Sequence, residues 1–445
     1  MRLYPFQEEA VAFAKQNRNV ILAHEPGLGK TAIAICATER FPILVVCPNT
    51  LKLFWQQQFR IWQSEDFSVE LFDGSVGASP NETLISRIYI IHYEALRKWW
   101  PVLAKVSWGT IVVDEAHRIK NRKAQQTKAI KKLNAPMKLL LTGTPIINRP
   151  DELWSLLNFL FPKDKRYTSY WRWFNEHVLA VPRPWGGFDI LGVRDPKGFR
   201  KSLQGIIIRR TKADVLPDLP EKTYTTVPID LGPEQRKAYD QMRLELMAEI
   251  SDDVTIIARE ALSKLIRLRQ LAIGLGFFDP ENMTSAKIDT IVEMIQDWNG
   301  KKVVVCSEFR WPVRRLVDAL RGVGVTAESL TGETPQEDRA ALVEKFQTQP
   351  SPQVLAMTSA TGGIGITLTA ADTMIFIDKP WAPAYLQQAE DRIHRIGQKS
   401  SVQIITLLAR KTIEERTEKL LLQKEAFFNQ VFTGKQFKQE FLDDE

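Results

Sequence analysis

The sequence predicts an α/β protein of two lobes, each a mainly parallel sheet flanked by helices, with a helical region between the lobes. Three observations support this class: short apolar runs rich in β-branched residues recur, helical patterns separate them, and the alternation pauses in the middle of the chain. The chain has 445 residues, of which 44% are hydrophobic and 25% are charged. These values are typical of a globular protein with more than one core, and no apolar run approaches the ~18 residues of a membrane span.

Apolar runs mark the expected strands of both lobes. The first lobe has runs at residues 20–23, 43–47, 88–92, 110–114 and 138–142, and the second at 303–306, 354–358, 374–378 and 403–409. The runs are continuous, as expected for strands that are buried on both faces. Between them, residues 151–289 are mostly helical and aromatic, with proline-containing breaks at 215–222 and 230–235. We therefore expect a first lobe, a helical connecting region, a second lobe with a final helix, and a tail, at residues 1–212, 213–285, 286–434 and 435–445.

The charge balance favours a polyanionic partner without proving one. The net charge is +7, and a local basic block without Asp or Glu contains Arg118, Lys120, Arg122, Lys123, Lys128, Lys131, Lys132 and Lys138. The block is either a nucleic-acid surface or an ordinary solvated helix face. The three cysteines lie in apolar segments without a CxxC pair, which predicts packing roles and no zinc. The N-terminus does not resemble a signal peptide, so we expect a cytosolic or nuclear compartment.

The segment LAHEPGLGKTAI, residues 22–33, resembles a phosphate-binding loop. Gly29, Lys30 and Thr31 fill the last positions of the pattern G-x-x-x-x-G-K-[ST], whereas His24 occupies the first glycine position. The loop follows an apolar run and precedes an alanine-rich helical pattern, which is the context that the motif requires. Gly27 and Gly29 would turn backbone N–H groups towards phosphate, Lys30 would neutralise the β- and γ-phosphates, and Thr31 would bind Mg²⁺. The alternative is a glycine turn followed by a surface lysine.

Two carboxylates follow the fourth expected strand in the segment TIVVDEAH. We expect Asp114 to hold Mg²⁺ and Glu115 to orient or deprotonate the water that attacks the γ-phosphorus of ATP. Because the carboxyl ends of parallel strands meet at one edge of a sheet, this pair would lie near the phosphate loop. The alternative is that the two acidic residues cap a helix.

These motifs resemble those of the superfamily-two helicases and translocases, and within them the Swi/Snf-type DNA-dependent ATPases, with similarity to the annealing-helicase branch. The family writes its loop A-x-x-x-G-x-G-K-T, which residues 23–31 fit, so the missing first glycine is a family habit. His24 stands where the family more often has an acidic residue, and Pro26 removes one N–H donor to phosphate. The resemblance covers residues 1–430 and includes LYPFQ, VVCPNTLKLFWQQQF, DEAHRIKN, LLLTGTP, IIIRRTKADVLPDLPEK, VVVCSEF, LTGETPQEDR, TSATGGIGITLTAADTMIFIDKPWAP and QQAEDRIHRIGQ.

The resemblance implies two RecA-like lobes and assigns further residues to the ATP site. Gln7 would read the adenine, and Arg392 and Arg395, on one helix face, would be arginine fingers for the γ-phosphate. Gln388 and Gly365 would complete that contact, while Thr142 and Thr144 would couple nucleotide state to lobe position. The alternative for the two arginines is an ion-pair network at the surface. ATP and Mg²⁺ are the expected cofactors.

The resemblance also implies that one strand of a duplex lies across both lobes. The expected phosphate contacts are small hydroxyls, cations and loop N–H groups that would bind without reading sequence and with salt sensitivity, namely Asn49, Thr50, Lys52, Tyr93, Arg118, Lys120, Ser359, Thr361 and Gly362. Trp381 is a further candidate, with a buried tryptophan as the alternative.

Three functions fit the sequence. The first is an ATP-driven translocase on duplex or forked DNA that remodels protein–DNA complexes, forks or annealing strands. The second is a strand-separating helicase, although nothing in the sequence resembles a separation pin or wedge. The third is a nucleotide-gated DNA-binding switch without turnover. We expect a monomeric motor without an attached targeting domain, located in the cytoplasm at the nucleoid, in the host cytoplasm if viral, or in the nucleus if eukaryotic.

Overall fold

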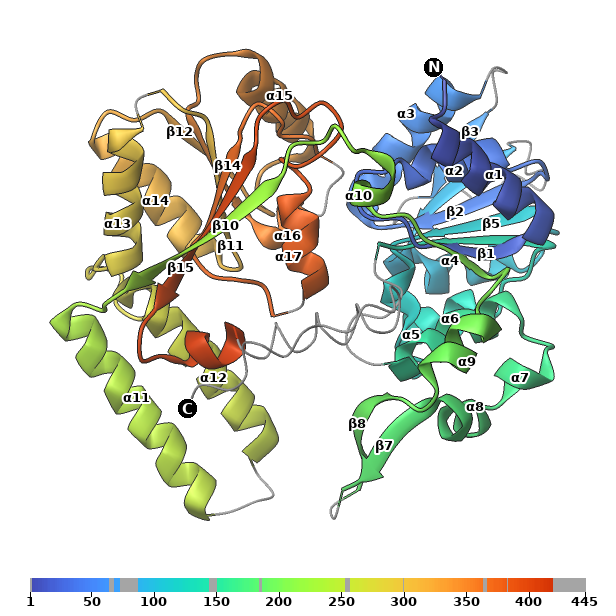
Figure 1. Ribbon diagram of the computed structural model, residues 1–445, viewed down its shortest axis with the longest axis horizontal. Helices are drawn as coiled ribbons and strands as arrows, with labels where there is room; N and C mark the ends of the chain where they lie inside the picture. The colour runs from blue at the N-terminus through green and yellow to red at the C-terminus, as the bar shows by residue number, and fades with distance from the viewer. Residues whose placement is uncertain are drawn as a thin grey trace. The chain divides into compact units, whose positions relative to one another are not determined.

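The computed structural model describes residues 2–63, 68–72, 87–143, 150–183, 186–252, 257–298, 300–362, 366–381 and 383–418. The chain divides into two compact units, the first reaching Pro217 and the second beginning at Asp218. Figure 1 labels the helices and strands of each unit. Among the described helices, none has the length and apolar character to cross a membrane.

The first unit is built on a parallel sheet. In the described residues its strand order is β3-β4-β2-β5-β6-β1-β9, and every pairing is parallel. The strands are β1 (Asn19–Leu22), β2 (Ile43–Cys47), β3 (Val69–Phe72), β4 (Ile88–His92), β5 (Thr110–Asp114), β6 (Met137–Leu141) and β9 (Ile207–Ile208). All five predicted strands are confirmed within one residue. Continuous burial explains this agreement, since β2, β5 and β6 are buried at every position.

Helices cover both faces of the first sheet. Side chains that alternate along the strands, such as Ile21, Val46 and Val113, share one core with α4 (Leu96–Leu103), α5 (Gln125–Ile130), α6 (Leu153–Leu160), α8 (Tyr170–His177) and α9 (Pro196–Ser202). The other face packs on α1 (Pro5–Asn17), α2 (Lys30–Ala37) and α3 (Lys52–Trp62), which contact β1, β6 and β4 respectively. The short helices α7 (Lys165–Thr168) and α10 (Lys212–Val215) complete the unit.

An antiparallel hairpin interrupts the region that the sequence predicts to be mostly helical. Strand β7 (Val178–Pro182) pairs with β8 (Phe188–Val193), and the register shifts between Leu179 and Ala180. Val178 and Val193 are buried in the core of the first unit, whereas most of the hairpin beyond them is exposed. Figure 1 shows the hairpin extending away from α8 and α9.

The second unit is also built on a parallel sheet, with the order β10-β15-β14-β11-β13-β12. Its strands are β10 (Lys222–Ile229), β11 (Val303–Ser307), β12 (Ala327–Leu330), β13 (Val354–Thr358), β14 (Thr373–Phe376) and β15 (Val402–Ala409). One face packs on α13 (Ala286–Asp297) and α14 (Arg310–Gly322), and the other on α15 (Gln336–Thr348) and α17 (Pro383–Glu390). The predicted fold class, two lobes with mainly parallel sheets flanked by helices, is therefore confirmed.

The segment predicted as a connecting region contributes a strand as well as helices. Strand β10 lies at the edge of the second sheet, where Pro228 is tolerated because an edge strand needs no N–H on its open side. Helices α11 (Pro233–Asp252) and α12 (Ile257–Ile273) pack against each other, and Tyr239, Leu268 and Ala409 share a small core. The second unit thus takes up this segment. The tail and most of the predicted final helix lie outside the described residues.

Candidate active site

The predicted phosphate loop connects β1 to α2 and has the backbone that such a loop requires. Gly27 and Gly29 have positive φ angles of 87° and 75°, and Gly29 is the N-cap of α2. The Lys30 ammonium donates hydrogen bonds to the carbonyl oxygens of His24 at 2.7 Å and of Glu25 at 3.2 Å. The backbone N–H groups in the first turn of α2 and one ammonium group therefore converge on this loop, which is an arrangement suited to anions.

Gln7 supports the phosphate loop from α1. Its Nε2 donates to the Leu28 carbonyl at 3.1 Å, and its Oε1 accepts a hydrogen bond from the Tyr4 backbone at 2.9 Å. A Cβ atom at Gly29 would lie 2.4 Å from Gln7 Nε2. The positive φ of residue 29 therefore favours glycine, and a larger residue there would also require the Gln7 amide to shift.

His24 is buried in the loop as a neutral imidazole. Burial lowers its pKa to about 3, and the nearby charges of Lys30, Arg210 and Arg209 lower it further. Its ring meets Phe6 edge-on with 6.2 Å between centroids, and neither ring nitrogen has a hydrogen-bond partner among the described residues. His24 therefore adds no charge to a loop that is surrounded by cations.

The segment around β9 holds the opposite side of the loop. The backbone N–H groups of Ala23 and Glu25 donate to the carbonyls of Ile208 and Arg210 at 2.8 and 3.1 Å. The Glu25 carboxylate accepts a hydrogen bond from the Lys212 backbone at 2.8 Å and lies 3.7 Å from the Arg209 guanidinium. The sequence pattern gives no sign of this role, because nothing in the spacing of residues so far apart indicates that they touch.

The predicted carboxylate pair lies at the end of β5, one strand from β6 and two strands from β1. Asp114 Oδ2 accepts a hydrogen bond from the indole of Trp55 at 2.8 Å. Burial raises the pKa of Asp114 to about 6, and the charge of Glu115 raises it too, while the Trp55 hydrogen bond and Lys30 oppose the shift. Lys30 is thus close enough to influence Asp114, so the structure brings the loop and the carboxylates together.

Glu115 has a strained backbone that directs its side chain. Its φ and ψ of 49° and 50° lie in the left-handed region, which a non-glycine residue enters at a cost of ~1–3 kcal/mol. Glu115 Oε2 lies 3.2 Å from His117 Nδ1, and the Tyr93 hydroxyl donates to the Asp114 carbonyl at 2.5 Å. Such strain is typical of functional positions, which agrees with a role for Glu115 beyond capping the next turn.

The residues present fit a divalent cation. Two carboxylates at adjacent positions meet here, with Asp114 buried and Glu115 partly buried beside the loop that carries Lys30. A hard cation such as Mg²⁺ prefers carboxylate and hydroxyl oxygen ligands. Asp114 and Thr31, the second residue of α2, are the groups that would hold it.

Thr142 and the residue after it connect β6 to the loop. Thr142 is buried, and its backbone donates to the Leu22 carbonyl at 3.2 Å. A Cβ atom at Gly143 would lie 3.0 Å from Pro26, and the Gly143 carbonyl accepts a hydrogen bond from Arg209 at 3.3 Å. The proline that replaces the usual family residue therefore packs on the predicted coupling segment. Thr144 lies outside the described residues.

The second unit changes one detail of the prediction. Helix α17 ends at Glu390, so Arg392 and Arg395 lie in the following turns and not on one helix face. In these turns the Arg392 backbone donates to the Ala389 carbonyl at 3.0 Å, and the Arg392 carbonyl accepts a hydrogen bond from the Leu368 backbone at 2.8 Å. Arg392 is buried, and Arg395 donates to the Thr367 hydroxyl at 3.1 Å. Gln388 lies on α17, and Gly365 is outside the described residues.

An ion-pair cluster holds the start of these turns. Lys222 of β10 donates to Glu390 at 2.9 Å and to Asp391 at 3.2 Å, and the Tyr224 hydroxyl donates to Glu390 at 3.0 Å. Burial opposes the charge of Lys222, but Asp391 and Glu390 outweigh it and raise its pKa. Only the folded sheet brings β10 next to these carboxylates, so the sequence offered no signal for this cluster.

The predicted nucleic-acid contacts of the first unit fall into two groups. Asn49 is exposed and Thr50 is half-buried, whereas Lys52 is largely buried in the first turn of α3. Tyr93 is buried, so its exposure gives no support to the predicted contact with DNA. Desolvation of the hydroxyl is compensated by its bond to the Asp114 carbonyl, and this bond leaves Tyr93 facing inwards.

Much of the basic block is directed onto acidic or aromatic groups. Arg118 and Lys120 pair with Glu94 and Glu152 at 2.8 and 3.0 Å. Cations lie over aromatic rings in the pairs Arg122–Tyr170 at 4.0 Å, Lys131–Trp154 at 4.4 Å and Lys132–Trp100 at 5.3 Å. Burial and then Arg122 lower the pKa of Lys131 to about 8. The block therefore contributes fewer free cations than its sequence suggests.

The predicted contacts of the second unit lie near α16 (Ser359–Gly362) and after β14. Ser359 and Gly362 belong to α16, while Thr361 is buried with its hydroxyl 2.7 Å from that of Thr358. The ring of Trp381 lies 5.0 Å from the Arg269 guanidinium. Trp381 is half-buried in this position. The position agrees both with a packing role for the tryptophan and with a contact between the edge of its ring and DNA.

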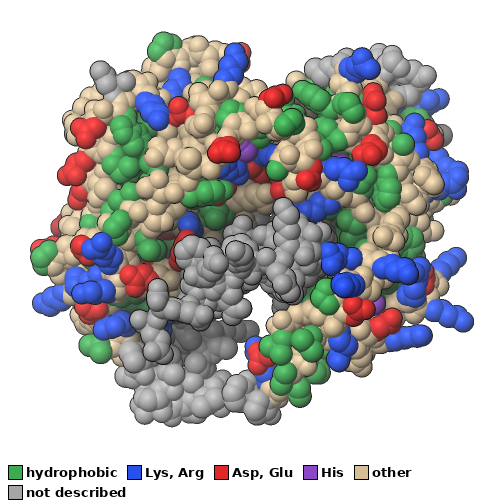
Figure 2. All heavy atoms as spheres, in the orientation of Figure 1, with side chains coloured by type: hydrophobic (Ala, Val, Ile, Leu, Met, Phe, Trp, Pro, Cys, Tyr) green, Lys and Arg blue, Asp and Glu red, His purple; other side chains and the backbone are tan. Residues whose placement is uncertain are grey.

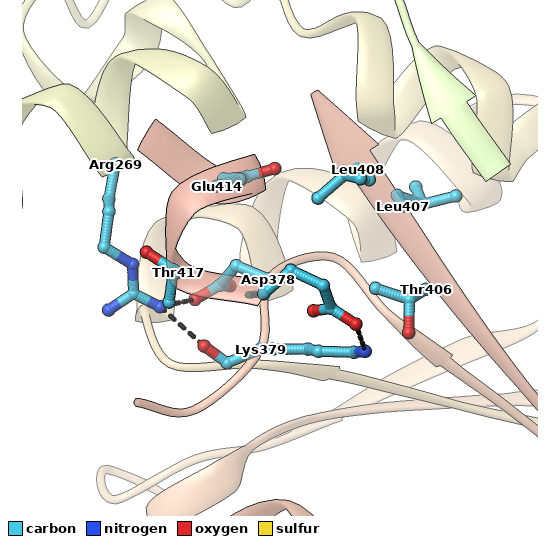
Figure 3. A pocket seen from close by; sticks show the side chains of 9 residues that line it. Arg269, Asp378, Lys379, Thr406, Leu407, Leu408, Glu414 and Thr417 are labelled. Carbon is cyan, nitrogen blue, oxygen red and sulfur yellow. Dashed lines mark hydrogen bonds and ion pairs between the residues drawn. The ribbon is translucent and has the colours of Figure 1, made fainter. Parts of the chain in front are cut away.

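Arg269 organises a polar network next to a small cavity (Figure 3). Its guanidinium donates to Asp378 at 3.0 Å and to the Lys379 carbonyl at 2.7 Å, while Lys379 pairs with Glu418 at 2.6 Å. The cavity has a volume of about 20 Å³, which suits a water molecule and not a nucleotide. This network is therefore a structural support for the segment that carries Trp381.

The fold and this site define the class of protein: parallel α/β units, of which the first carries a phosphate loop with two carboxylates near it. The chain belongs to the SNF2-related family of helicase-type, ATP-dependent proteins. The SNF2-related domain matches residues 6–273, and the helicase conserved C-terminal domain matches residues 286–397.

Individual relatives are similar over nearly the whole chain. An uncharacterized ATP-dependent helicase of Mycoplasma pneumoniae is 30% identical, over 94% of this chain and 41% of the relative. The DNA annealing helicase and endonuclease ZRANB3 of Mus musculus is 29% identical, over 100% of this chain and 42% of the relative. The chain thus spans about two fifths of the length of these relatives. Among solved structures, the Sulfolobus solfataricus SWI2/SNF2 ATPase core in complex with dsDNA is 28% identical, with a TM-score of 0.46 over 98% of this chain and 93% of that one.

Proposed function

We propose that the chain is a DNA-dependent ATPase that moves along duplex or forked DNA. The observation that carries the proposal is the convergence of Lys30 with Asp114 and Glu115 at the ends of nearby parallel strands. Lys30 and the N–H groups of the loop bind the phosphates, Gln7 lies beside the adenine, and Glu115 activates the attacking water. Mg²⁺, held by Thr31 and Asp114, would neutralise charge on the β- and γ-phosphates.

The second unit supplies the remaining catalytic groups in this proposal. Arg392 and Arg395 would stabilise the charge of the transition state, and Gln388 and Gly365 would complete that contact. Such arginines are generally worth ~10³ to 10⁵ in rate. Thr142 and Thr144 couple the nucleotide to movement. Pro26, which packs on Gly143, supports this coupling because a shift of the loop must displace the segment after β6.

DNA is the proposed polymer because sequence-independent contacts suffice for a motor. The net charge of +7 favours a polyanion. The proposed contacts with the DNA backbone are Asn49, Thr50, Lys52, Arg118, Lys120, Ser359, Thr361, Gly362 and Trp381. The similarity to a mouse protein named as a DNA annealing helicase supports the same choice. Remodelling of protein–DNA complexes, forks or annealing strands would follow from movement along the duplex, and the motor acts as a monomer.

Steady-state ATPase activity tests this proposal. The activity should be measured without nucleic acid and with single-stranded DNA, duplex DNA, forked DNA and RNA, each at two salt concentrations. We expect duplex or forked DNA to stimulate turnover strongly, and stimulation to weaken at the higher salt. Stimulation by single strands alone would instead support a strand-separating helicase, and nucleotide binding without turnover on any substrate would support a switch.

A further inference from the structure

The hairpin β7–β8 and helix α8 carry an exposed apolar surface that the ATP site does not use. Of the fifteen large apolar side chains that are exposed in the described part of the chain, five lie within residues 171–191, namely Trp171, Leu179, Val181, Phe188 and Leu191. We call these five residues the hairpin platform. Figure 2 shows hydrophobic side chains gathered at this end of the first unit, with Lys and Arg side chains beside them.

The platform is rigidly supported from below. The ring centroids of Phe188 and Trp171 lie 5.9 Å apart. The ring centroid of Phe174 lies 5.2 Å from that of Phe188 and 5.6 Å from that of Trp171. Arg122 lies 5.9 Å from the ring of Trp171. At the other end Val178 and Val193 anchor the hairpin in the core. Trp171 nevertheless exposes 52% of its surface and Leu191 61%, so the support holds apolar groups in solvent.

The outer face of the hairpin carries exposed apolar side chains that packing within the unit does not explain. Ala180 and Ile190 pack against the core, so Leu179 and Val181, which alternate with Ala180, lie on the opposite face, where Asp189 is the cross-strand partner of Val181. Leu191 lies at the register shift next to Ile190 and is exposed as well. Solvent-facing positions of a two-stranded hairpin usually carry polar groups, because an exposed apolar edge invites aggregation. A partner that covers these side chains explains their presence.

The surrounding charge identifies the chemistry of that partner. Residues 163–201 contain nine basic and four acidic residues, a net charge of +5 out of +7 for the chain. Only Arg166 and Arg183 of these cations pair with described acidic residues, Asp164 and Asp189, and Arg172, Arg194 and Lys197 are exposed without such an ion pair. Protein interface cores are depleted of such charge, whereas nucleic-acid surfaces combine cations with aromatic rings.

We propose that the hairpin platform contacts the unpaired or terminal bases of DNA at a junction where the duplex ends. Trp171 and Phe188 offer ring faces to bases, and Leu179, Val181 and Leu191 act as an apolar wedge against the last base pair. Arg172, Arg194 and Lys197 hold the flanking phosphates. The inference rests on the proposed function, because it requires that the chain acts on DNA.

Fluorescence of 2-aminopurine tests the platform independently of ATP turnover. The probe is placed as the first unpaired base of a fork, in either arm, and is titrated with the full chain without nucleotide. We expect binding to change the probe signal, and the fork to bind about tenfold more tightly than a duplex of equal length. Trp171→Ala and Arg194→Glu should each lose the fork preference, Trp171→Tyr should keep it, and Phe278→Ala, another exposed aromatic substitution, should leave it unchanged.

The outcomes separate the platform from the motor. The proposal would be overturned if Trp171→Ala left both the probe signal and the preference for forked DNA unchanged. It would also be overturned if the wild-type chain were a dimer that Leu191→Ser converted to a monomer, because the platform would then be a protein interface. Stimulation of the ATPase by closed circular duplex DNA, which has no junction, should survive both Trp171→Ala and Arg194→Glu. Its absence in the wild type would contradict the proposed motor, while the fork titration would still decide the role of the platform.

Discussion

The indole nitrogen of Trp55 donates a hydrogen bond to Asp114 Oδ2 over 2.8 Å, in a pair that is buried from solvent. The bond ties α3 to the carboxyl end of β5 and leaves the other carboxylate oxygen to accept from the Glu115 backbone at 2.9 Å. Asp114 is thus fixed in orientation by neighbours that do not themselves bind phosphate. Groups that orient a metal ligand in this way tune its affinity for the cation.

Trp55→Phe should weaken the use of Mg²⁺. The substitution removes the donor that lowers the pKa of Asp114, so the carboxylate becomes harder to ionise and less well oriented. We expect the Mg²⁺ concentration for half-maximal ATPase activity to rise about tenfold. Trp62→Phe is the matched control, since Trp62 lies on the same helix and its indole donates to Gln58 and not to a carboxylate among the described residues. Equal Mg²⁺ dependence in the two variants would refute the role of Trp55.

His24 should make the protein less stable in acid. Its pKa of about 3 in the folded chain lies below the usual value near 6.5, so between these values the unfolded chain binds a proton that the folded chain does not. Stability contributed by the neutral ring is therefore lost as the pH falls through 6.5. From pH 7.5 to 5 this loss is about 2 kcal/mol. Urea unfolding at both pH values should show the loss in the wild type and a smaller one in His24→Asn; equal losses would contradict the assignment.

Gly29→Ala should impair nucleotide binding through two effects. An alanine at φ +75° costs about 1 kcal/mol, and its Cβ would lie 2.4 Å from Gln7 Nε2. We expect the dissociation constant of the Gly29→Ala variant for a fluorescent ATP analogue to rise at least tenfold.

Gly300→Ala separates the two effects. Gly300 has a similar φ of +76°, but no atom lies within 4 Å of the position that its Cβ would take, so only the conformational cost applies. This variant should lose a little thermal stability and bind nucleotide normally. If Gly29→Ala also bound nucleotide normally, the close approach of the loop to Gln7 would have no functional role.

Lys287→Met should destabilise the second unit. Lys287 is fully buried and donates to Glu414 at 2.7 Å and to the carbonyls of Ile377 and Leu407 at 2.6 and 3.1 Å. Removing it leaves a buried carboxylate without its partner, which costs about 3–5 kcal/mol. Adding Glu414→Gln should recover part of the loss, because the uncompensated charge disappears.

Lys379→Met provides the comparison for Lys287. Lys379 pairs with Glu418 in a partly exposed position, where an ion pair contributes about 0–1 kcal/mol. Denaturant unfolding of the three variants should therefore rank Lys287→Met as the least stable. If Lys287→Met lowered the free energy of unfolding no more than Lys379→Met does, the buried ion pair would stabilise the unit no more than the partly exposed one.

Continuous apolar runs made the central strands predictable, and the remaining strands lacked that signal. Strands β2, β5 and β6 are buried on both faces and rich in Val, Ile and Leu. Strand β10 was not predicted because it lies at an edge, is largely exposed and contains Pro228. The hairpin β7–β8 was missed because proline and glycine interrupt its short strands.

The candidate site was predictable where the expected contact is with phosphate or a cation, and not where a residue contacts another residue of the chain. Lys30, Asp114 and Glu115 belong to compact motifs whose spacing reflects their chemistry. Trp55, which orients Asp114, and Arg209, which lies beside Glu25, come from distant segments that only the folded sheet brings close. The basic block was overestimated for the same reason, because its aromatic neighbours lie elsewhere in the sequence.

ATP binding and turnover by Glu115→Gln test the central claim most directly. If Glu115 activates the attacking water, this variant should bind a fluorescent ATP analogue with wild-type affinity and hydrolyse ATP at least about 100-fold more slowly in saturating duplex DNA. Lys30→Ala should lose both binding and hydrolysis. Hydrolysis at the wild-type rate by Glu115→Gln would contradict the assignment of the active site.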